Sequence, residues 1–202
     1  MFLNRLFEDP AYFFQYLVII ILSICLHELS HGYAAISQGD DTPKRLGHIT
    51  LNPIVHMGVP SLLFLCFSGM AWGLMPVTRS NFRDRKYGDM IVAAAGPLMN
   101  LALALMAIAL INIALSLSWD GALTINFVYL FAYINLILFL FNLLPIPPLD
   151  GYSVWSTLFP GLKVLEGQAG MALLVMLFVL PVFGRTLATG AQSILNAFLP
   201  FG

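Results

Sequence analysis

Charged residues are scarce in this sequence, and their scarcity excludes most classes of protein. Of its 202 residues only 9% are charged and 59% are apolar, whereas a soluble domain carries about 25% charged residues. Nine basic residues against ten acidic ones give a net charge of -1, which does not fit a nucleic-acid binder. The composition also excludes a soluble globular domain and a disordered chain, and it predicts an integral membrane protein.

Cysteines, repeats and linkers are also few or absent. The two cysteines, Cys25 and Cys66, lie inside apolar stretches, so a disulfide framework is excluded in practice. No internal repeat, low-complexity segment or shift in composition marks a boundary, and the sequence therefore predicts one domain over residues 1–202. Glu8 and Asp9 do not fit a signal peptide, so the first apolar run is expected to be retained as a span.

Six apolar stretches are present, and a chain of this length has room for about five or six spans of roughly 20 residues. They cover residues 11–37, 57–75, 90–117, 123–144, 171–180 and 185–199. Pro181 and Gly184 separate the last two, which form either one kinked helix or a helical hairpin. The expected fold is an all-α polytopic membrane protein.

The basic residues predict which parts of the chain face the cytoplasm. Six of the nine lie in two segments, residues 39–56 and 76–89, and the positive-inside rule places both segments on the cytoplasmic side. The stretch 57–75 between them is then expected to re-enter the membrane, as a small element that is part helix and part extended or β. Its Pro60 and Gly73 agree with this, because irregular backbone at membrane depth is tolerated only against protein or a wet cavity. Two true crossings, or one crossing with a weaker charge rule, are the alternatives.

The sharpest functional signal is the sequence His27-Glu28-Leu29-Ser30-His31 within the first apolar stretch. Residues four apart on a helix share one face, so both imidazoles can reach one metal ion. Glu28 follows the first ligand and is suited to act as a general base on water. The alternative is a polar patch that only satisfies its neighbours, but a central acid costs about 2.5–3.5 kcal/mol to insert into a membrane.

A catalytic zinc ion usually has three protein ligands, so a third ligand is needed. His48 and His56 are candidates by residue type. Asp150 is a third candidate, although Asp is also an ordinary turn residue in the sequence Pro-Leu-Asp-Gly. If residues 39–89 begin and end on one side, two further crossings bring Asp150 to the face and depth of the two histidines.

Two asparagines in apolar surroundings allow two interpretations each. Asn142 can donate a hydrogen bond to an oxyanion, or it can form the interhelical hydrogen bond that is common for Asn in membrane bundles. Asn100 has the same two interpretations, and the preceding Gly96 and Pro97 fit a close helix contact.

Four motifs follow one another between residues 27 and 151. They are His27-Glu28-Leu29-Ser30-His31-Gly32, the segment from Gly47 to His56 with Asn52-Pro53, Ala95-Gly96-Pro97-Leu98-Met99-Asn100, and the segment from Asn142 to Asp150-Gly151. In this order they resemble the site-2 protease family of intramembrane zinc metalloproteases. The chain departs from larger members because it has no insert the size of a PDZ domain and no C-terminal nucleotide-sensing module.

The resemblance implies a role for each matching residue. His27, His31 and Asp150 would bind one zinc ion, Glu28 would be the general base, and Asn142 would stabilise the oxyanion. Supporting roles near the site are implied for Asn52, Pro53, His56 and Asn100. The first, third and fourth stretches would form the family's three-helix catalytic core, with the re-entrant or β element between the first two core helices.

The resemblance also implies partners and a location. Members of the family cleave membrane-embedded segments, so the implied partners are the transmembrane segment of a substrate protein and the lipid bilayer, with no nucleic acid. The implied location is the inner membrane of a prokaryotic cell, with the active site toward the cytoplasm. The oligomeric state is not predicted.

The same residues also allow other functions. Intramembrane His, Glu and Asp also mark transporters and metal-handling proteins, although the internal repeats common in transporters are absent. A pseudoenzyme that binds a membrane helix has nothing in its favour, because the ligands and the base are all present. A different membrane metallopeptidase would need Glu8 or Glu166 as third ligand, and neither lies in a fitting motif.

Overall fold

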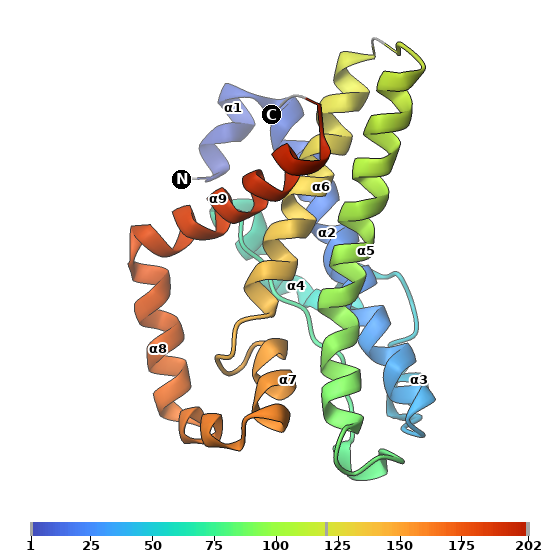
Figure 1. Cartoon of the computed structure of the whole chain (residues 1–202), viewed down its shortest axis with the longest axis vertical. Helices are drawn as coiled ribbons and strands as arrows, with labels where there is room; N and C mark the ends of the chain where they lie inside the picture. The colour runs from blue at the N-terminus through green and yellow to red at the C-terminus, as the bar shows by residue number, and fades with distance from the viewer. Residues whose placement is uncertain (1, 120, 201–202) are drawn as a thin grey trace. The chain divides into compact units, whose positions relative to one another are not determined.

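A computed structural model of the chain describes residues 2–119 and 121–200 (Figure 1). Within these residues the regular structure is helical and contains no β-strand. The main helices are α1 (Arg5–Glu8), α2 (Pro10–Ser37), α3 (Thr42–Arg45), α4 (Pro53–Ser68), α5 (Gly88–Ser116), α6 (Ala122–Asn142), α7 (Asp150–Leu158), α8 (Gln168–Val179) and α9 (Pro181–Phe198). Short 3-10 helices are η1 (Phe2–Asn4), η2 (Arg79–Asn81) and η3 (Pro160–Leu165).

Three helices, α2, α5 and α6, are long and apolar enough to cross a membrane. They correspond to the three stretches expected to form the catalytic core, and the prediction of an all-helical membrane protein is confirmed. Helices α8 and α9 meet at a bend of 79° and together make at most one further span. Six spans would require α4, α8 and α9 each to count as one, and five spans would require two of them. None of these helices alone is both long and apolar enough.

The chain divides into two compact units, residues 1–84 and residues 85–202. The first unit contains α1 to α4 and η2, and the second contains α5 to α9 and η3. The single domain expected over residues 1–202 stays a prediction.

In the first unit, α2 begins with a strong start signal. The Asp9 carboxylate accepts a hydrogen bond from the Tyr12 N–H (3.0 Å), and Pro10 occupies the first helical turn, where no N–H is needed. Helix α2 packs against α4 and α3, and its buried residues include all the ionisable groups of the His-Glu-His motif.

Helix α4 is broken by its own sequence. Gly58 has the positive φ of 68°, and Pro60 lacks the N–H that would bond to the carbonyl of His56 four residues earlier. The freed His56 carbonyl instead accepts a hydrogen bond from the N–H of Leu74, at 2.8 Å. The break therefore creates an attachment point for a segment that follows the helix.

Residues 70–77, here called the extended segment, run beside α4 after the helix ends at Ser68. The Ser61 hydroxyl accepts a hydrogen bond from the Trp72 N–H (2.9 Å) and donates one to the Trp72 carbonyl (2.7 Å). The Ser61 side chain thus bonds the backbone groups of Trp72 that a neighbouring β-strand would bond in a sheet. The β alternative for this element is wrong for the described residues, since the segment is extended but belongs to no sheet.

Asp40 joins the loop after α2 to the segment that leads out of the extended segment. It is fully buried, and its carboxylate accepts hydrogen bonds from the Thr42 N–H and hydroxyl, the Thr78 N–H (2.7 Å) and the Asn81 amide (2.9 Å). Burial by itself would raise the pKa of Asp40, but these donors outweigh it and hold the pKa below its ordinary value. Asp40 therefore stabilises this loop as a carboxylate.

Replacing Asp40 by Asn is expected to lower the free energy of unfolding by about 1.5–3 kcal/mol, because the Thr78 N–H loses a charged acceptor. A carboxyl whose folded pKa is lowered stabilises the fold above its ordinary pKa of 3.8, and this contribution is lost as the pH falls through the lower folded value. Denaturant unfolding in detergent at several pH values measures both effects. Asp41→Asn is the control, because Asp41 is exposed and pairs only with Arg45 in the salt bridges found. Equal stability of the two variants would contradict the role given to Asp40.

In the second unit, α5 and α6 run side by side and α9 packs against α6 (Figure 1). Their shared core contains four alanines at the helix contacts, which lets the backbones approach closely, as is typical of membrane helices. The buried members are Ala104, Ala107, Ile108, Ile111, Ala132, Leu136, Ala191, Leu195 and Leu199.

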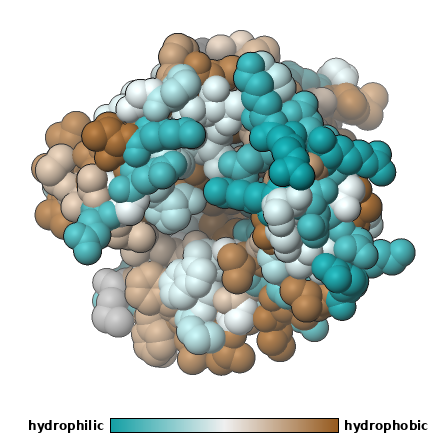
Figure 2. All heavy atoms as spheres, turned by 90° about the horizontal axis from the view of Figure 1, so that it is seen from below, coloured by the Kyte–Doolittle hydropathy of each residue, from teal (hydrophilic) through white to brown (hydrophobic). Residues whose placement is uncertain are grey.

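Figure 2 shows hydrophilic side chains gathered on one face, with hydrophobic side chains around them. The exposed bases Lys44 and Arg45 lie on α3, Arg79 lies on η2, and Arg83 lies before α5. All of them are outside the three candidate spans, as expected of residues that follow the positive-inside rule.

Candidate metal centre

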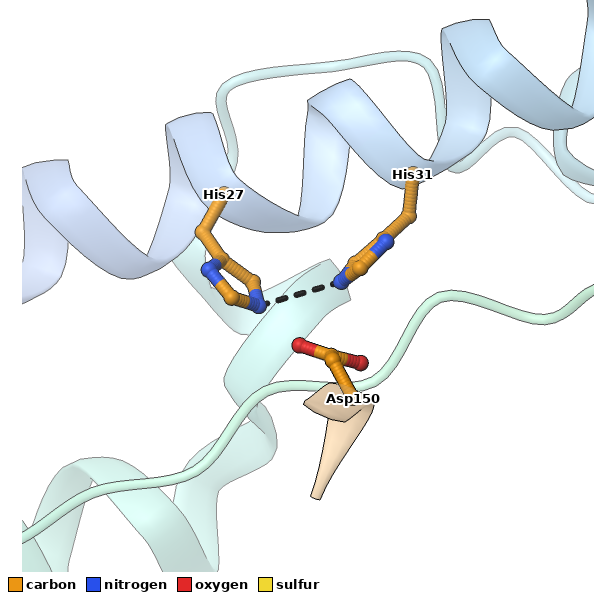
Figure 3. Close-up of side chains that lie close together, drawn as sticks. All are labelled: His27, His31 and Asp150. Atoms are coloured by element: carbon orange, nitrogen blue, oxygen red, sulfur yellow. Dashed lines mark hydrogen bonds between the residues drawn. The ribbon is translucent and has the colours of Figure 1, made fainter. Parts of the chain in front are cut away.

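His27 and His31 are brought together by one turn of α2. Their Nε2 atoms are 3.0 Å apart, and both rings are buried, with exposed fractions of 7% and 6%. Figure 3 shows the two imidazoles projecting from the same face of the helix and turned toward each other, with the dashed line marking this contact. The i, i+4 spacing in the sequence therefore produces the convergence that a shared metal ion needs.

The separation of the two nitrogens fits zinc. Two nitrogen ligands at 2.0–2.1 Å from a tetrahedral zinc ion lie about 3.3 Å apart, close to the 3.0 Å observed here. Neutral imidazole nitrogens are also among the ligands that zinc prefers. The pair could therefore hold a metal ion between its two rings.

Glu28 lies between these histidines in sequence and is buried as well, with 7% of its surface exposed. Its side chain lies against the backbone of Gly73 in the extended segment. A buried carboxylate one residue after the first histidine has the position of the general base in the His-Glu-x-x-His motif.

Asp150, the third residue labelled in Figure 3, belongs to the second unit and is the first residue of α7. Gly151 fixes how α7 begins, because a Cβ there would meet the carbonyls of Leu143 and Leu144 at the end of α6. The Trp155 indole also donates to the Leu143 carbonyl, at 2.9 Å. Asp150 is half-buried, and α7 is held against α5 and against residues 143–144, which follow α6.

Asn142 is the last residue of α6. Its amide nitrogen donates a hydrogen bond to the carbonyl of Leu138, at 3.0 Å. An amide nitrogen carries two hydrogens, so this bond leaves a second donor for an oxyanion. The bond in the structure lies within one helix and is not the interhelical bond considered from the sequence.

Asn100 forms the interhelical hydrogen bond that the sequence allowed for it. Its amide donates to the side-chain oxygen of Asn135 on α6 (3.0 Å), and the Asn135 amide donates to the Phe131 carbonyl. Both asparagines are fully buried between α5 and α6. In this structure Asn100 therefore links two helices of the second unit.

Asn52, Pro53 and His56 build the start of α4. Asn52 caps the helix by accepting a hydrogen bond from the Ile54 N–H (3.0 Å), and Pro53 takes the first helical position. The buried His56 donates from Nε2 to the Thr50 carbonyl, at 2.7 Å. These three residues shape the helix that carries the extended segment.

His48 lies near His56, with 6.0 Å between the ring centroids. Burial, with a smaller contribution from His56, lowers the pKa of His48 below its ordinary value, which favours the neutral ring.

Ser61 and Gly73 were missed in the sequence reasoning as residues of the site. A serine in an apolar helix and a glycine in an irregular segment are common, and neither spacing nor charge distinguishes them. Pro60 did give a signal, because a proline inside a helix always leaves one carbonyl without its usual donor.

Comparisons with known proteins indicate a zinc metalloprotease. The profile of Peptidase family M50 matches residues 110–183. YwhC of Bacillus subtilis (strain 168), whose name provisionally assigns it as a zinc metalloprotease, is 36% identical over 97% of this chain and 96% of its own length. Rip2 of Mycolicibacterium smegmatis, named in the same way, is 29% identical over 82% of this chain and 66% of its own length. No solved structure matches the chain.

The protein is thus a zinc-dependent metallopeptidase built on apolar, membrane-type helices. The chain belongs to Peptidase family M50, the site-2 protease family. This membership favours the peptidase over the transporter and metal-handling alternatives.

Proposed function

We propose that this peptidase hydrolyses peptide bonds within or next to the transmembrane segments of other membrane proteins. The observation that carries the proposal is the burial of His27, Glu28 and His31 inside α2, a candidate span of 28 residues. The motif begins at the eighteenth of these residues, within the apolar part of the helix. A site at that depth is within reach of polypeptide that itself lies in the membrane.

We propose that Asp150 completes the ligand set of His27 and His31. Two imidazoles and one carboxylate are a common ligand set of catalytic zinc and leave a position open. Zinc, when bound, polarises the scissile carbonyl and lowers the pKa of water to about 7. Asp150 begins a helix that packs against α5 and lies close to Leu143 and Leu144 after α6, and such a held position suits a metal ligand.

The proton transfers are assigned to Glu28. Its carboxylate accepts a proton from the attacking water and delivers a proton to the nitrogen of the leaving amine. The second hydrogen of the Asn142 amide is proposed to stabilise the oxyanion as the carbonyl becomes tetrahedral.

The extended segment is proposed to receive the substrate. A transmembrane helix hides its carbonyls in intrahelical hydrogen bonds, so the substrate must unwind locally before attack. The backbone N–H groups of Trp72 and Leu74 donate hydrogen bonds to α4. In an extended chain the backbone N–H and C=O groups of Gly73 and Met75 point the opposite way. Backbone pairing along that opposite edge would hold an unwound peptide beside Glu28.

The proposed orientation places the site toward the cytoplasmic side of the inner membrane of a prokaryotic cell. It rests on the exposed bases of residues 39–56 and 76–89, which follow and precede candidate spans. The loop after α2 is the proposed route for water.

Metal removal tests the function. The purified protein in detergent is expected to cleave a model transmembrane substrate, to lose this activity after treatment with a chelator, and to regain it when zinc is restored. Cleavage is followed by mass spectrometry of the products. A soluble peptide with the same scissile sequence but no apolar stretch is the control and is expected to be cleaved far more slowly. Cleavage that survives metal removal, or that is equally fast on the soluble peptide, would contradict the proposal.

A further inference from the structure

We infer that Gly73 is a positioning residue that, with the break in α4, holds the carboxylate of Glu28 in place for proton transfer. The inference rests on the proposed function of Glu28 as general base. Pro60 and Ser61 take part as well, because they hold the extended segment against α4.

Direct packing joins Gly73 to Glu28. A Cβ on Gly73 would lie 2.7 Å from Cγ and 2.8 Å from Cδ of Glu28, and nearer still to the carboxylate oxygen Oε1. These separations are far shorter than van der Waals contact. The space that a side chain at position 73 would fill is therefore occupied by the end of Glu28.

Both neighbours of Gly73 are fixed to α4. Trp72 is bonded through its N–H and its carbonyl to the hydroxyl of Ser61, which is fully buried. Leu74 is bonded through its N–H to the His56 carbonyl, which Pro60 leaves without a helical donor. The hydrogen bonds of residues 72 and 74 to α4 measure 2.7–2.9 Å between donor and acceptor atoms. They hold the backbone of Gly73 in a fixed position beside the Glu28 side chain.

A fixed backbone at Gly73 restricts the flexible side chain of the proposed base, Glu28. Glutamate has three side-chain torsions, and a catalytic group has to be held within about 0.5 Å of its productive position. A misplacement of about 1 Å can cost roughly 100-fold in rate. Glycine lets the backbone itself touch the carboxylate, so the position of Glu28 is set by a hydrogen-bonded element.

Gly73→Ala tests the inference. Because the group in the way is the movable end of Glu28, the variant is expected to fold with near wild-type thermal stability and full zinc content. Its kcat is expected to fall roughly 10- to 100-fold, with KM within about twofold of wild type. Gly184→Ala in α9 is the matched control, since a Cβ there has no atom within 4 Å, and all its measurements should stay at wild-type values.

Two further measurements separate the inference from its rivals. In a Glu28→Gln background, Gly73→Ala is expected to leave the affinity for the uncleaved transmembrane substrate unchanged, whereas a weaker affinity would show that Gly73 contacts substrate instead. Ser61→Ala is expected to lower kcat in the same direction with zinc retained, because Trp72 loses both of its bonds. Wild-type kcat in Gly73→Ala or Ser61→Ala would overturn the inference, even if Glu28→Gln is inactive. Undiminished cleavage by Glu28→Gln would instead reject the role of general base proposed for Glu28.

Discussion

Substitution of Glu28 by Gln is expected to lower kcat roughly 1,000-fold while the bound zinc is retained. Glutamine matches glutamate in size, so it fits the space against Gly73 and leaves His27 and His31 undisturbed. Its neutral amide cannot accept a proton from water, and both proton transfers assigned to Glu28 therefore fail. Cleavage rates on a transmembrane substrate and zinc content by elemental analysis together measure the effect.

The control for this experiment is Glu166→Gln, the same chemical change at an exposed acid. Glu166 accepts a hydrogen bond from the Tyr152 hydroxyl (3.0 Å) in the second unit, and its substitution should leave both kcat and zinc content unchanged. A Glu28→Gln variant that cleaves at the wild-type rate would show that another group moves the proton. Loss of zinc from the same variant would show that Glu28 supports the ligands and not the proton transfers.

Substitution of Asp150 by Ala is expected to remove a zinc ligand and to weaken zinc binding by more than about 100-fold, with loss of cleavage. Two imidazoles alone bind zinc poorly, although their geometry on α2 is unaffected. Zinc content after dialysis against a weak chelator measures the loss, and a titration with added zinc measures the affinity.

Asp89→Ala serves as the matched control for Asp150→Ala. Both aspartates lie in the first turn of a helix of the second unit, where an acid stabilises the helix dipole by about 0.3–1 kcal/mol. Loss of that stabilisation is common to the two variants, and only Asp150 is proposed to touch the metal. Full zinc content in Asp150→Ala would leave Asp150 as a residue that only begins its helix.

The long helices could be predicted from the sequence because their signals are local. The apolar stretches 11–37, 90–117 and 123–144 match α2, α5 and α6 closely, since continuous hydrophobicity over the length of a span is sufficient to define such a helix. The stretch 57–75 does not coincide with α4. Its helix begins earlier, at Pro53, and ends at Ser68, because capping by Asn52 and the positive φ of Gly69 set the ends more strongly than hydrophobicity does.

Part of the candidate site could likewise be predicted from local sequence signals, and part could not. His27, Glu28 and His31 lie within five residues of one helix, so periodicity alone predicts that the imidazoles converge, and the 3.0 Å separation of their nitrogens agrees. The roles of Ser61 and Gly73 depend on a contact between elements far apart in sequence. No local pattern encodes such a contact, because the hydroxyl of Ser61 would serve equally well to bond within its own helix.

The placement of both histidines and the base on a single helix has a mechanical consequence. A helix is stiff over a few residues, so tilting or sliding α2 as a rigid body leaves the distances among His27, Glu28 and His31 backbones unchanged. A substrate that deformed the surroundings of α2 would therefore leave the two proposed ligands and the proposed base together. Gly73 belongs to the extended segment and not to α2. Motion of α2 relative to the extended segment would therefore first change the contact between Gly73 and Glu28. Small shifts of the extended segment would then change the cleavage rate while α2 keeps its structure.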